Sequence, residues 1–325
     1  MISNAIAVEG LKKRFDDVQA LSGISFNVGK GELFGFLGPN GAGKTTTINV
    51  LTGLARADAG TVVIGGIDCT HKPRAAQHLV GIVPDESNLY PELTGFGNLC
   101  FCAALYGMSI KERKQRAQRL LADFGLSKAA DRKFATYSKG MKRKLTVAAG
   151  IIHRPRILFL DEPTTGIDVA SARGLRRLIA ELNREGITIF LTTHYIEEAE
   201  RLCDRIAFIV SGRIVKTDSV AHLLQPLKGR HILEITFSGA RASIKQELSR
   251  EFPGLDFELS KHGIIRVEAG EEIRVGPLVR FLEEQDAEVA EARKVRPSLE
   301  EVFIKVTGIE AEAMRAEKEK KGKGR

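Results

Sequence analysis

Residues 38–45 read Gly38-Pro39-Asn40-Gly41-Ala42-Gly43-Lys44-Thr45 and fit the pattern G-x-x-x-x-G-K-[ST], with Thr46 continuing into an expected helix. The apolar run 33–37 directly before them indicates a strand. Glycines at this spacing let the backbone turn tightly and aim its N–H groups inward. The lysine brings a positive charge to the β- and γ-phosphates of a nucleotide, and the threonine hydroxyl suits Mg²⁺. The stretch therefore predicts a nucleotide-binding loop at a helix N-terminus, which kinases, GTPases, helicases and transporters all share.

A second segment ends an apolar run in two acids. Residues 157–162 read Ile157-Leu158-Phe159-Leu160-Asp161-Glu162. Four apolar residues followed by two carboxylates are typical of a buried parallel strand that presents its acids at the carboxyl edge of an α/β sheet, where ligands bind. We expect Asp161 to hold Mg²⁺ together with Thr45, and Glu162 to polarise the attacking water.

Three further segments carry a family resemblance. Tyr137-Ser138-Lys139-Gly140-Met141 precedes the acidic strand, Pro163-Thr164-Thr165-Gly166-Ile167-Asp168 follows it, and Leu191-Thr192-Thr193-His194 ends a later apolar strand. Together with the phosphate loop, this ordered set resembles the nucleotide-binding domain of ABC transporters. The resemblance implies that the chain binds and hydrolyses ATP with Mg²⁺ and works beside a separate membrane permease.

The resemblance also implies roles for particular residues. Ser138 and Gly140 are expected to contact the γ-phosphate of an ATP held by the opposite subunit, so the active unit would be a head-to-tail homodimer. His194 is expected to contact the γ-phosphate and the attacking water, and Asp168 to lie where the two sites meet. The expected catalytic groups are Lys44, Glu162 and His194.

The match departs from the family pattern at two places and is open at a third. Lys139 replaces the first of two adjacent signature glycines. Asp85 stands where the family has a glutamine that touches Mg²⁺; a carboxylate there can still ligate the cation but adds negative charge to the site, so the metal should be more necessary. Phe15 is the candidate for the aromatic platform under adenine, with a core position as the alternative.

Composition bounds the class of protein. A chain of 325 residues with 43% hydrophobic content predicts two domains. No run approaches the roughly 18 apolar residues of a membrane helix, and residues 1–4 do not resemble a signal peptide. The four cysteines lack metal or redox spacing and indicate thiols in a reducing compartment. We therefore expect a peripheral protein at the cytoplasmic face of the cell membrane.

The net charge of +8 lies entirely in residues 1–225, because acidic and basic residues are equally frequent in residues 226–325. No basic stretch is interleaved with aromatic residues, which make up 6% of the chain. Base stacking on single strands is therefore not expected, and no nucleic-acid partner is predicted. Attraction to an anionic membrane surface is the favoured use of the charge.

The organisation follows from the pattern of apolar residues. Alternating strand and helix patterns predict an ABC cassette with a mostly parallel, doubly wound sheet over residues 1–225. One of its helices is predicted to begin at the capping box Ser109-Ile110-Lys111-Glu112, and another at Asp168 as N-cap. Its helical subdomain is expected at residues 89–150, where the aromatic residues Phe96, Phe101 and Tyr106 are interpreted as core, with an interface to the membrane subunit as the alternative. The order βαββαβ predicts a small ferredoxin-like α+β domain over residues 226–308, read as regulatory or dimer-supporting. Residues 309–325 are predicted to be a disordered basic tail.

The ending Pro297-Ser298-Leu299-Glu300-Glu301-Val302-Phe303 resembles that of ATP-binding subunits of the ABC-2 exporter branch, including the daunorubicin-resistance and sodium-extrusion types. The expected function is ATP-driven dimer closure that powers a separate permease. The leading alternative is a soluble ABC ATPase acting on nucleic acid or ribosomes, and a P-loop kinase is the third. The kinase leaves the segment 137–141 and His194 without a role.

Overall fold

The computed structural model describes residues 4–227, 229–239, 243–259, 263–295 and 298–309. Within these, the chain forms two compact units. The first comprises residues up to Val220 together with the segment from Phe303 onward, and the second comprises residues 221–302. The expected tail lies outside the described residues except for Ile309.

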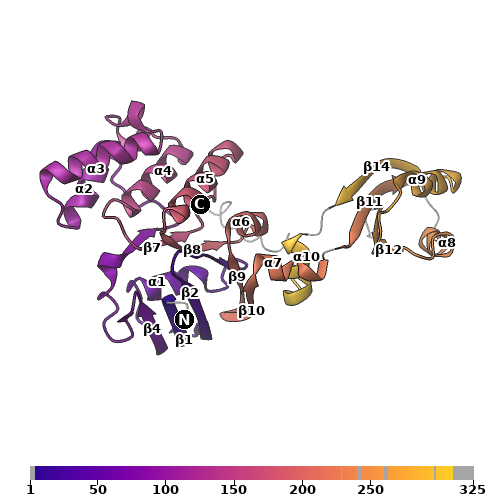
Figure 1. The fold of residues 1–325 in the computed structure, drawn as a ribbon, viewed down its shortest axis with the longest axis horizontal. Coiled ribbons are helices and arrows are strands. Elements are labelled where there is room, and N and C mark those ends of the chain that lie inside the picture. Colours follow the sequence, from indigo (N-terminus) through magenta and orange to yellow (C-terminus); the bar gives the residue numbers. More distant parts are fainter. Residues whose placement is uncertain (1–3, 228, 240–242, 260–262, 296–297, 310–325) are drawn as a thin grey trace. The chain divides into compact units, whose positions relative to one another are not determined.

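A six-stranded sheet is the framework of the first unit (Figure 1). Its strand order is β10-β9-β3-β8-β7-β6, and every neighbouring pair is parallel except β10 and β9. The central strands β3, β7 and β8 are buried along their whole length, as expected for parallel strands covered on both faces. The strands are β3 (Leu33–Leu37), β6 (Val80–Val83), β7 (Ile157–Asp161), β8 (Thr188–Thr193), β9 (Arg205–Val210) and β10 (Arg213–Ser219).

A second, antiparallel sheet of the first unit has the order β2-β1-β4-β5. It packs against the larger sheet through apolar side chains, and the ring of Phe26 lies 5.7 Å from the rings of both Phe34 and Phe190. The sequence did not predict strand β1, whose pairing with β2 is interrupted by several register shifts that break a regular alternation. The strands are β1 (Asn4–Phe15), β2 (Val18–Gly29), β4 (Ala59–Ile64) and β5 (Ile67–Asp68).

Several helices of the first unit begin at residues whose side chains are suited to capping a helix N-terminus. Ser109 and Glu112 form the predicted capping box, and Thr94, Ser138 and Asp168 each accept a hydrogen bond from a backbone N–H of the next turn. The helices are α1 (Lys44–Leu51), α2 (Gly95–Leu105), α3 (Ile110–Asp123), α4 (Lys139–Gly150), α5 (Val169–Arg184), α6 (Ile196–Leu202) and α7 (Val220–Leu223), with 3₁₀ turns η1 (Gln77–Leu79), η2 (Ser127–Ala129), η3 (Phe134–Thr136) and η4 (Gln225–Leu227).

Helices α2, α3 and α4 pack on one another as the helical subdomain. Helix α2 buries the face that carries Asn98, Leu99 and Ala103. The interpretation of the aromatic residues as core is wrong for Phe101, which lies on the other face of α2, and for Tyr106, the C-cap of this helix, whose ring stacks on His153 but stays partly exposed. Apolar side chains at the surface of a soluble helix indicate a contact surface.

The second unit has the predicted βαββαβ order. Its sheet order, β12-β13-β11-β14 with every neighbouring pair antiparallel, is that of a split βαβ fold, and α8 and α9 pack on an apolar core. The elements are β11 (His231–Ser238), α8 (Ile244–Glu251), β12 (Asp256–Leu259), β13 (Ile264–Ala269), α9 (Val275–Glu284) and β14 (Glu288–Val295). The closing helix is α10 (Leu299–Thr307). Its Phe303 belongs to the first unit and packs within that unit on Phe208, with ring centres 5.3 Å apart.

Candidate nucleotide-binding site

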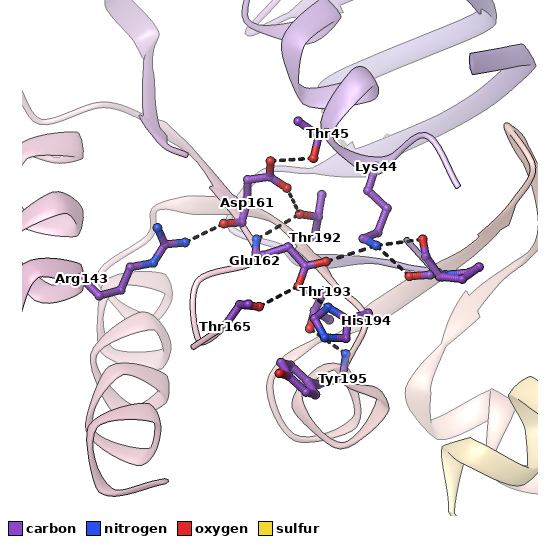
Figure 2. A network of polar contacts seen from close by, with 12 residues as sticks. Lys44, Thr45, Arg143, Asp161, Glu162, Thr165, Thr192, Thr193, His194 and Tyr195 are labelled. Atoms are coloured by element: carbon purple, nitrogen blue, oxygen red, sulfur yellow. Dashed lines mark hydrogen bonds and ion pairs between the residues drawn. The ribbon is translucent and has the colours of Figure 1, made fainter. Parts of the chain in front are cut away.

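The predicted loop, acids and histidine meet at the carboxyl edge of the large sheet. Strands β3, β8 and β7 are adjacent there, and each ends in a functional segment. Residues 38–43 lead from β3 into α1, Asp161 ends β7 and Glu162 follows it, and His194 follows β8 (Figure 2). Parallel strands that end at one edge thus bring together residues more than 100 positions apart.

The phosphate loop requires glycine at its tightest points. Gly43 has a φ of +104°, and a Cβ on it would lie 2.7 Å from the carbonyl oxygen of Ala20. A Cβ on Gly38 would collide with the carbonyl of Ile209. The loop therefore keeps its shape because neighbouring backbone approaches too closely for a side chain.

Lys44 is buried at the base of this loop, with 6% of its surface exposed. Its Nζ donates to the carbonyl oxygens of Gly38 and Pro39 at 2.8 and 3.0 Å and lies 3.1 Å from Glu162 Oε1. A buried ammonium is retained only with anionic or strongly polar partners. The position of Nζ at the loop is therefore one at which phosphate oxygens would be stabilised.

Glu162 is the centre of the buried network in Figure 2. Its second oxygen lies 2.5 Å from Nδ1 of His194 and accepts a hydrogen bond from Thr165 at 3.0 Å. Burial raises the pKa of Glu162, but the His194 hydrogen bond and the Lys44 charge outweigh it and lower the pKa to about 2. Glu162 is therefore ionised at neutral pH, and Nδ1 of His194 carries the proton that it donates. The backbone at Glu162 has a φ of +47°, a strained conformation of the kind that functional sites retain.

Asp161 forms a separate pair of hydrogen bonds beside this network. Its carboxylate accepts from Thr45 at 2.8 Å and from Thr192 at 2.5 Å. Burial raises the pKa of Asp161, the two hydroxyls oppose that, and the charges of Glu162 and Asp85 raise it further. A buried carboxylate next to a hydroxyl is a donor set that fits Mg²⁺ when substrate and water complete the coordination. No cluster of three or more acidic, histidine or cysteine ligands occurs in the described ranges.

Arg143 joins the segments of the site and was missed by the sequence analysis. Its guanidinium donates to the carbonyl oxygens of Pro163 at 2.7 Å and Asp161 at 2.6 Å, and also to those of Pro84 and Asp85. Burial lowers the pKa of Arg143, and the Asp85 and Asp161 charges oppose that shift. Nothing local distinguishes Arg143 from its basic neighbours on α4, so only the packing of that helix on the strand ends identifies it.

Other predicted residues lie apart from this network. Ser138 and Asp168 are exposed N-caps of α4 and α5, and neither is hydrogen-bonded to Lys44 or Glu162. A Cβ on Gly140 would collide with the side chain of Ser171 on α5, so packing within one chain already requires glycine there. Ser138, Gly140 and Asp168 therefore do not take part in the network around Lys44 and Glu162 of their own chain.

The remaining two predicted positions are at the surface. Phe15 ends β1 with 47% of its surface exposed and with Lys13 Nζ 5.0 Å from the ring centre, so the alternative of a core position is wrong. Asp85 is exposed, and its backbone oxygen is the atom that Arg143 binds. Its carboxylate is close enough to Asp161 to affect the pKa of that residue.

Comparisons with known proteins agree with this geometry. Residues 21–165 match the family model described as ABC transporter. The chain is 41% identical over 234 residues to the linearmycin resistance ATP-binding protein of Bacillus subtilis, covering 72% of this chain and 75% of that protein. It is 36% identical to the daunorubicin/doxorubicin resistance ATP-binding protein of Streptomyces peucetius, covering 95% of this chain and 94% of the relative. A Nod factor export ATP-binding protein of Burkholderia orbicola is 37% identical, covering 94% and 97% of the two chains.

Solved structures resemble the first unit. An ATP-binding subunit of an ABC transporter superposes with a TM-score of 0.62 at 30% identity, covering 69% of this chain and 93% of that one. A bacterial ABC transporter cassette described as dimeric superposes with a TM-score of 0.61 at 27% identity, covering 66% and 98%. The resemblance stated from the motifs is confirmed, and the alternative of an ATPase acting on nucleic acid is not favoured. The chain belongs to the ABC transporter family, as an ATP-hydrolysing subunit of the ABC-2 exporter type that powers a membrane permease.

Proposed function

We propose that two copies of this chain close head to tail over two ATP molecules and that each copy completes the other's site. The observation that carries the proposal is the buried network in which Lys44 and His194 both bind Glu162, with Thr45 and Asp161 paired beside it. These groups can bind phosphate, hold a cation and orient a water, which are the tasks of phosphoryl transfer. Positioning and electrostatic stabilisation would supply most of the rate.

Lys44 links nucleotide binding to the base. In this structure its ammonium is shared between the loop carbonyls and Glu162. The β- and γ-phosphates of ATP compete for the same charge and would draw it away from the carboxylate. Since the Lys44 charge contributes to the low pKa of Glu162, its departure raises that pKa and makes Glu162 a better general base when substrate is present.

Thr45 and Asp161 are the residues proposed to hold Mg²⁺, and Asp85 is proposed as a third, outer contributor. When bound, the cation would neutralise charge on the phosphates and orient them. Burial and the nearby charges of Glu162 and Asp85 raise the pKa of Asp161, and a cation bound there would favour its charged form. Phe15, exposed at the end of β1, is proposed to stack on adenine.

The head-to-tail arrangement is supported by what one chain leaves exposed. Ser138 caps α4, and Ser138 and Lys139 at the start of this helix are exposed. A helix N-terminus attracts phosphate. Because Ser138 makes no contact with Lys44 or Glu162 of its own chain, we propose that Ser138, Gly140 and Asp168 face the partner's nucleotide.

A mixing experiment tests the composite site. Ser138→Asp keeps a side-chain acceptor for the N-cap but sets a negative charge against the partner's γ-phosphate, and Lys44→Ala removes the phosphate-binding charge. A hybrid dimer of the two variants has one site with both lesions and one intact site. ATPase activity should therefore recover on mixing, up to roughly half of the wild-type value per hybrid dimer if the sites act independently. Absence of recovery in hybrids shown to form would overturn the proposal.

We propose that the exposed face of the helical subdomain receives the permease at the cytoplasmic side of the membrane. Within the described part of the chain, no helix is long and apolar enough to cross a bilayer. The exposed apolar side chains of this region are Tyr90, Leu93, Phe101, Leu105, Tyr106 and Ile110. Residues 221–302 are proposed to be an accessory domain that supports or regulates the dimer.

Leu105, with 71% of its surface exposed, is suited to testing this docking surface. Leu105→Glu should keep ATP binding and abolish co-purification with the permease, because a carboxylate buried at that contact would lack a partner. Leu54→Glu is the matched control, since Leu54 is 67% exposed and lies outside the subdomain. Retained co-purification of the Leu105 variant would place the docking surface elsewhere.

A further inference from the structure

Glu198 is a buried acid of helix α6 that the network around Glu162 does not include. Only 2% of its surface is exposed, and neither carboxyl oxygen has a well-formed hydrogen bond among the described residues. Burial raises the pKa of Glu198, and the nearby hydroxyls of Thr193 and Thr164 and the charge of Arg176 offset part of that rise. A buried carboxyl without strong partners destabilises a fold, so its presence calls for a role.

The two hydroxyls near Glu198 belong to the two strand-end segments of the candidate site. Thr193 is the last residue of β8 and directly precedes His194, whereas Thr164 lies two residues after Glu162. The Thr193 oxygen accepts a hydrogen bond from the backbone N–H of Tyr195 at 3.0 Å (Figure 2). Its own proton therefore remains to be donated, and the Glu198 carboxyl is a neighbouring acceptor.

Free space lies between these segments on one side of Glu198. A hollow of about 320 Å³ is lined by Thr164 and Ile167 from the segment after β7, by Val169, Ala172 and Arg176 of α5, and by residues 195–198 at the start of α6. Since the segments do not pack tightly across this hollow, apolar contact alone does not set their separation. A carboxyl group that accepts a hydrogen bond from a hydroxyl of each segment can set that separation.

We propose that Glu198 is a positioning residue for ATP hydrolysis, which holds Thr193 and Thr164 and thereby fixes His194 relative to Glu162. Glu198 does not touch the nucleotide in this account. In this account the Glu198 carboxyl forms hydrogen bonds with the two hydroxyls when the dimer closes, since contacts in ligand-free sites commonly tighten in the complex. The inference rests on the proposed roles of Glu162 and His194.

Substitution at Glu198 should separate turnover from binding. Glu198→Ala is expected to lower kcat about 10- to 100-fold, since small misplacements of catalytic groups cost that much, while the Kd for ATP changes by less than about threefold because Lys44 and the loop 38–45 are untouched. Glu198→Gln keeps the shape and an acceptor oxygen, and should retain at least about a third of the wild-type kcat. Glu197→Gln is the matched control, because Glu197 is exposed and pairs with Arg201 on the same helix.

Thr164→Val provides the second test and leaves Glu198 in place. If the two residues act as one link, the kcat losses of Thr164→Val and Glu198→Ala combine to less than their product in the double variant. Multiplicative losses, a matching fall in ATP affinity, or a Gln variant as impaired as the Ala variant would each overturn the proposal. If Glu198→Ala fails to fold, Thr164→Val and Glu198→Gln are compared instead. The proposal then requires that Thr164→Val lowers kcat without changing the Kd for ATP, and that Glu198→Gln retains its kcat.

A failure of the positioning role of Glu198 can be distinguished from a failure of the proposed role of Glu162 as the base. An active Glu162→Gln enzyme would remove the premise, whereas an inactive Glu162→Gln enzyme together with a fully active Glu198→Ala enzyme would sink the positioning role alone.

Discussion

The carboxyl edge of the six-stranded sheet and the sheet of residues 221–302 differ in how far they bury their charged side chains. At the first, charged groups are buried; these are Lys44, Arg143, Asp161, Glu162 and Glu198. In the second, Glu234 pairs with Arg266 and Arg293 on side chains that are 22%, 24% and 63% exposed. All charged residues that are buried within the described ranges lie in the first unit.

This difference indicates where the chemistry is located. A charge removed from water acquires a shifted pKa, a demand for specific partners and a strong field, all of which serve catalysis. Charges on an exposed sheet remain hydrated, and such pairs contribute little to stability. The buried charges of the first unit therefore suit catalysis, whereas the second unit presents a polar surface.

The largest expected effect concerns the base. Glu162→Gln should bind ATP but lower the hydrolysis rate about 10²–10⁴-fold, the usual contribution of a positioned general base. Dimers with trapped ATP should accumulate, which size-exclusion chromatography with labelled nucleotide can show. Glu234→Gln in the second unit is the control and should hydrolyse ATP at the wild-type rate. Near wild-type turnover by the Glu162 variant would mean that another group activates the water.

Substitution of one arginine in each region tests this comparison directly. Arg143→Met leaves several buried carbonyl oxygens without a donor and should lower the free energy of unfolding by about 2–4 kcal/mol. Arg293→Met removes only an exposed pairing and should leave thermal unfolding unchanged. Unfolding scans followed by nucleotide binding measure both. Equal effects in the two variants would show that burial does not distinguish the regions.

The pH dependence of stability follows from the pKa of Glu162. Its folded-state pKa of about 2 lies below the ordinary 4.5, so the ionised group stabilises the fold above pH 4.5, and this stabilisation is lost as the pH falls toward 2. The contribution is up to about 3 kcal/mol. The stability difference between the wild type and Glu162→Gln should narrow on acidification through that range. A constant difference would contradict the Lys44 and His194 pairing.

The smallest expected effect lies at the exposed edge of the reactive region. Asp85→Gln removes a carboxylate whose charge reaches Asp161, so half-maximal ATPase activity should need about two- to fivefold more Mg²⁺, a modest change because solvent screens Asp85. Glu86→Gln, the adjacent exposed acid, is the control. An unchanged titration would place the Asp85 carboxylate outside the metal site.

Local sequence predicted most of the cassette's central elements. Strands β3, β7 and β8 were predicted because each is a continuous apolar run, and α3 and α5 because their caps lie in the sequence. Strand β1 was not predicted, because its bulges interrupt the alternation. The aromatic residues of α2 were assigned to the core because composition alone does not determine which face of a helix is covered.

The sequence by itself determined that the chain binds a nucleotide, which loop does so and which acids end the neighbouring strand, because backbone geometry at Gly38 and Gly43 and the chemistry of phosphate and Mg²⁺ restrict the residue types. It also predicted the βαββαβ order of the second unit. Only the tertiary structure showed that Arg143 joins the site and that Glu198 is a buried acid between two strand ends. Both are ordinary charged helix residues in the sequence, and only burial by segments distant in the chain, which removes water as a partner, distinguishes them.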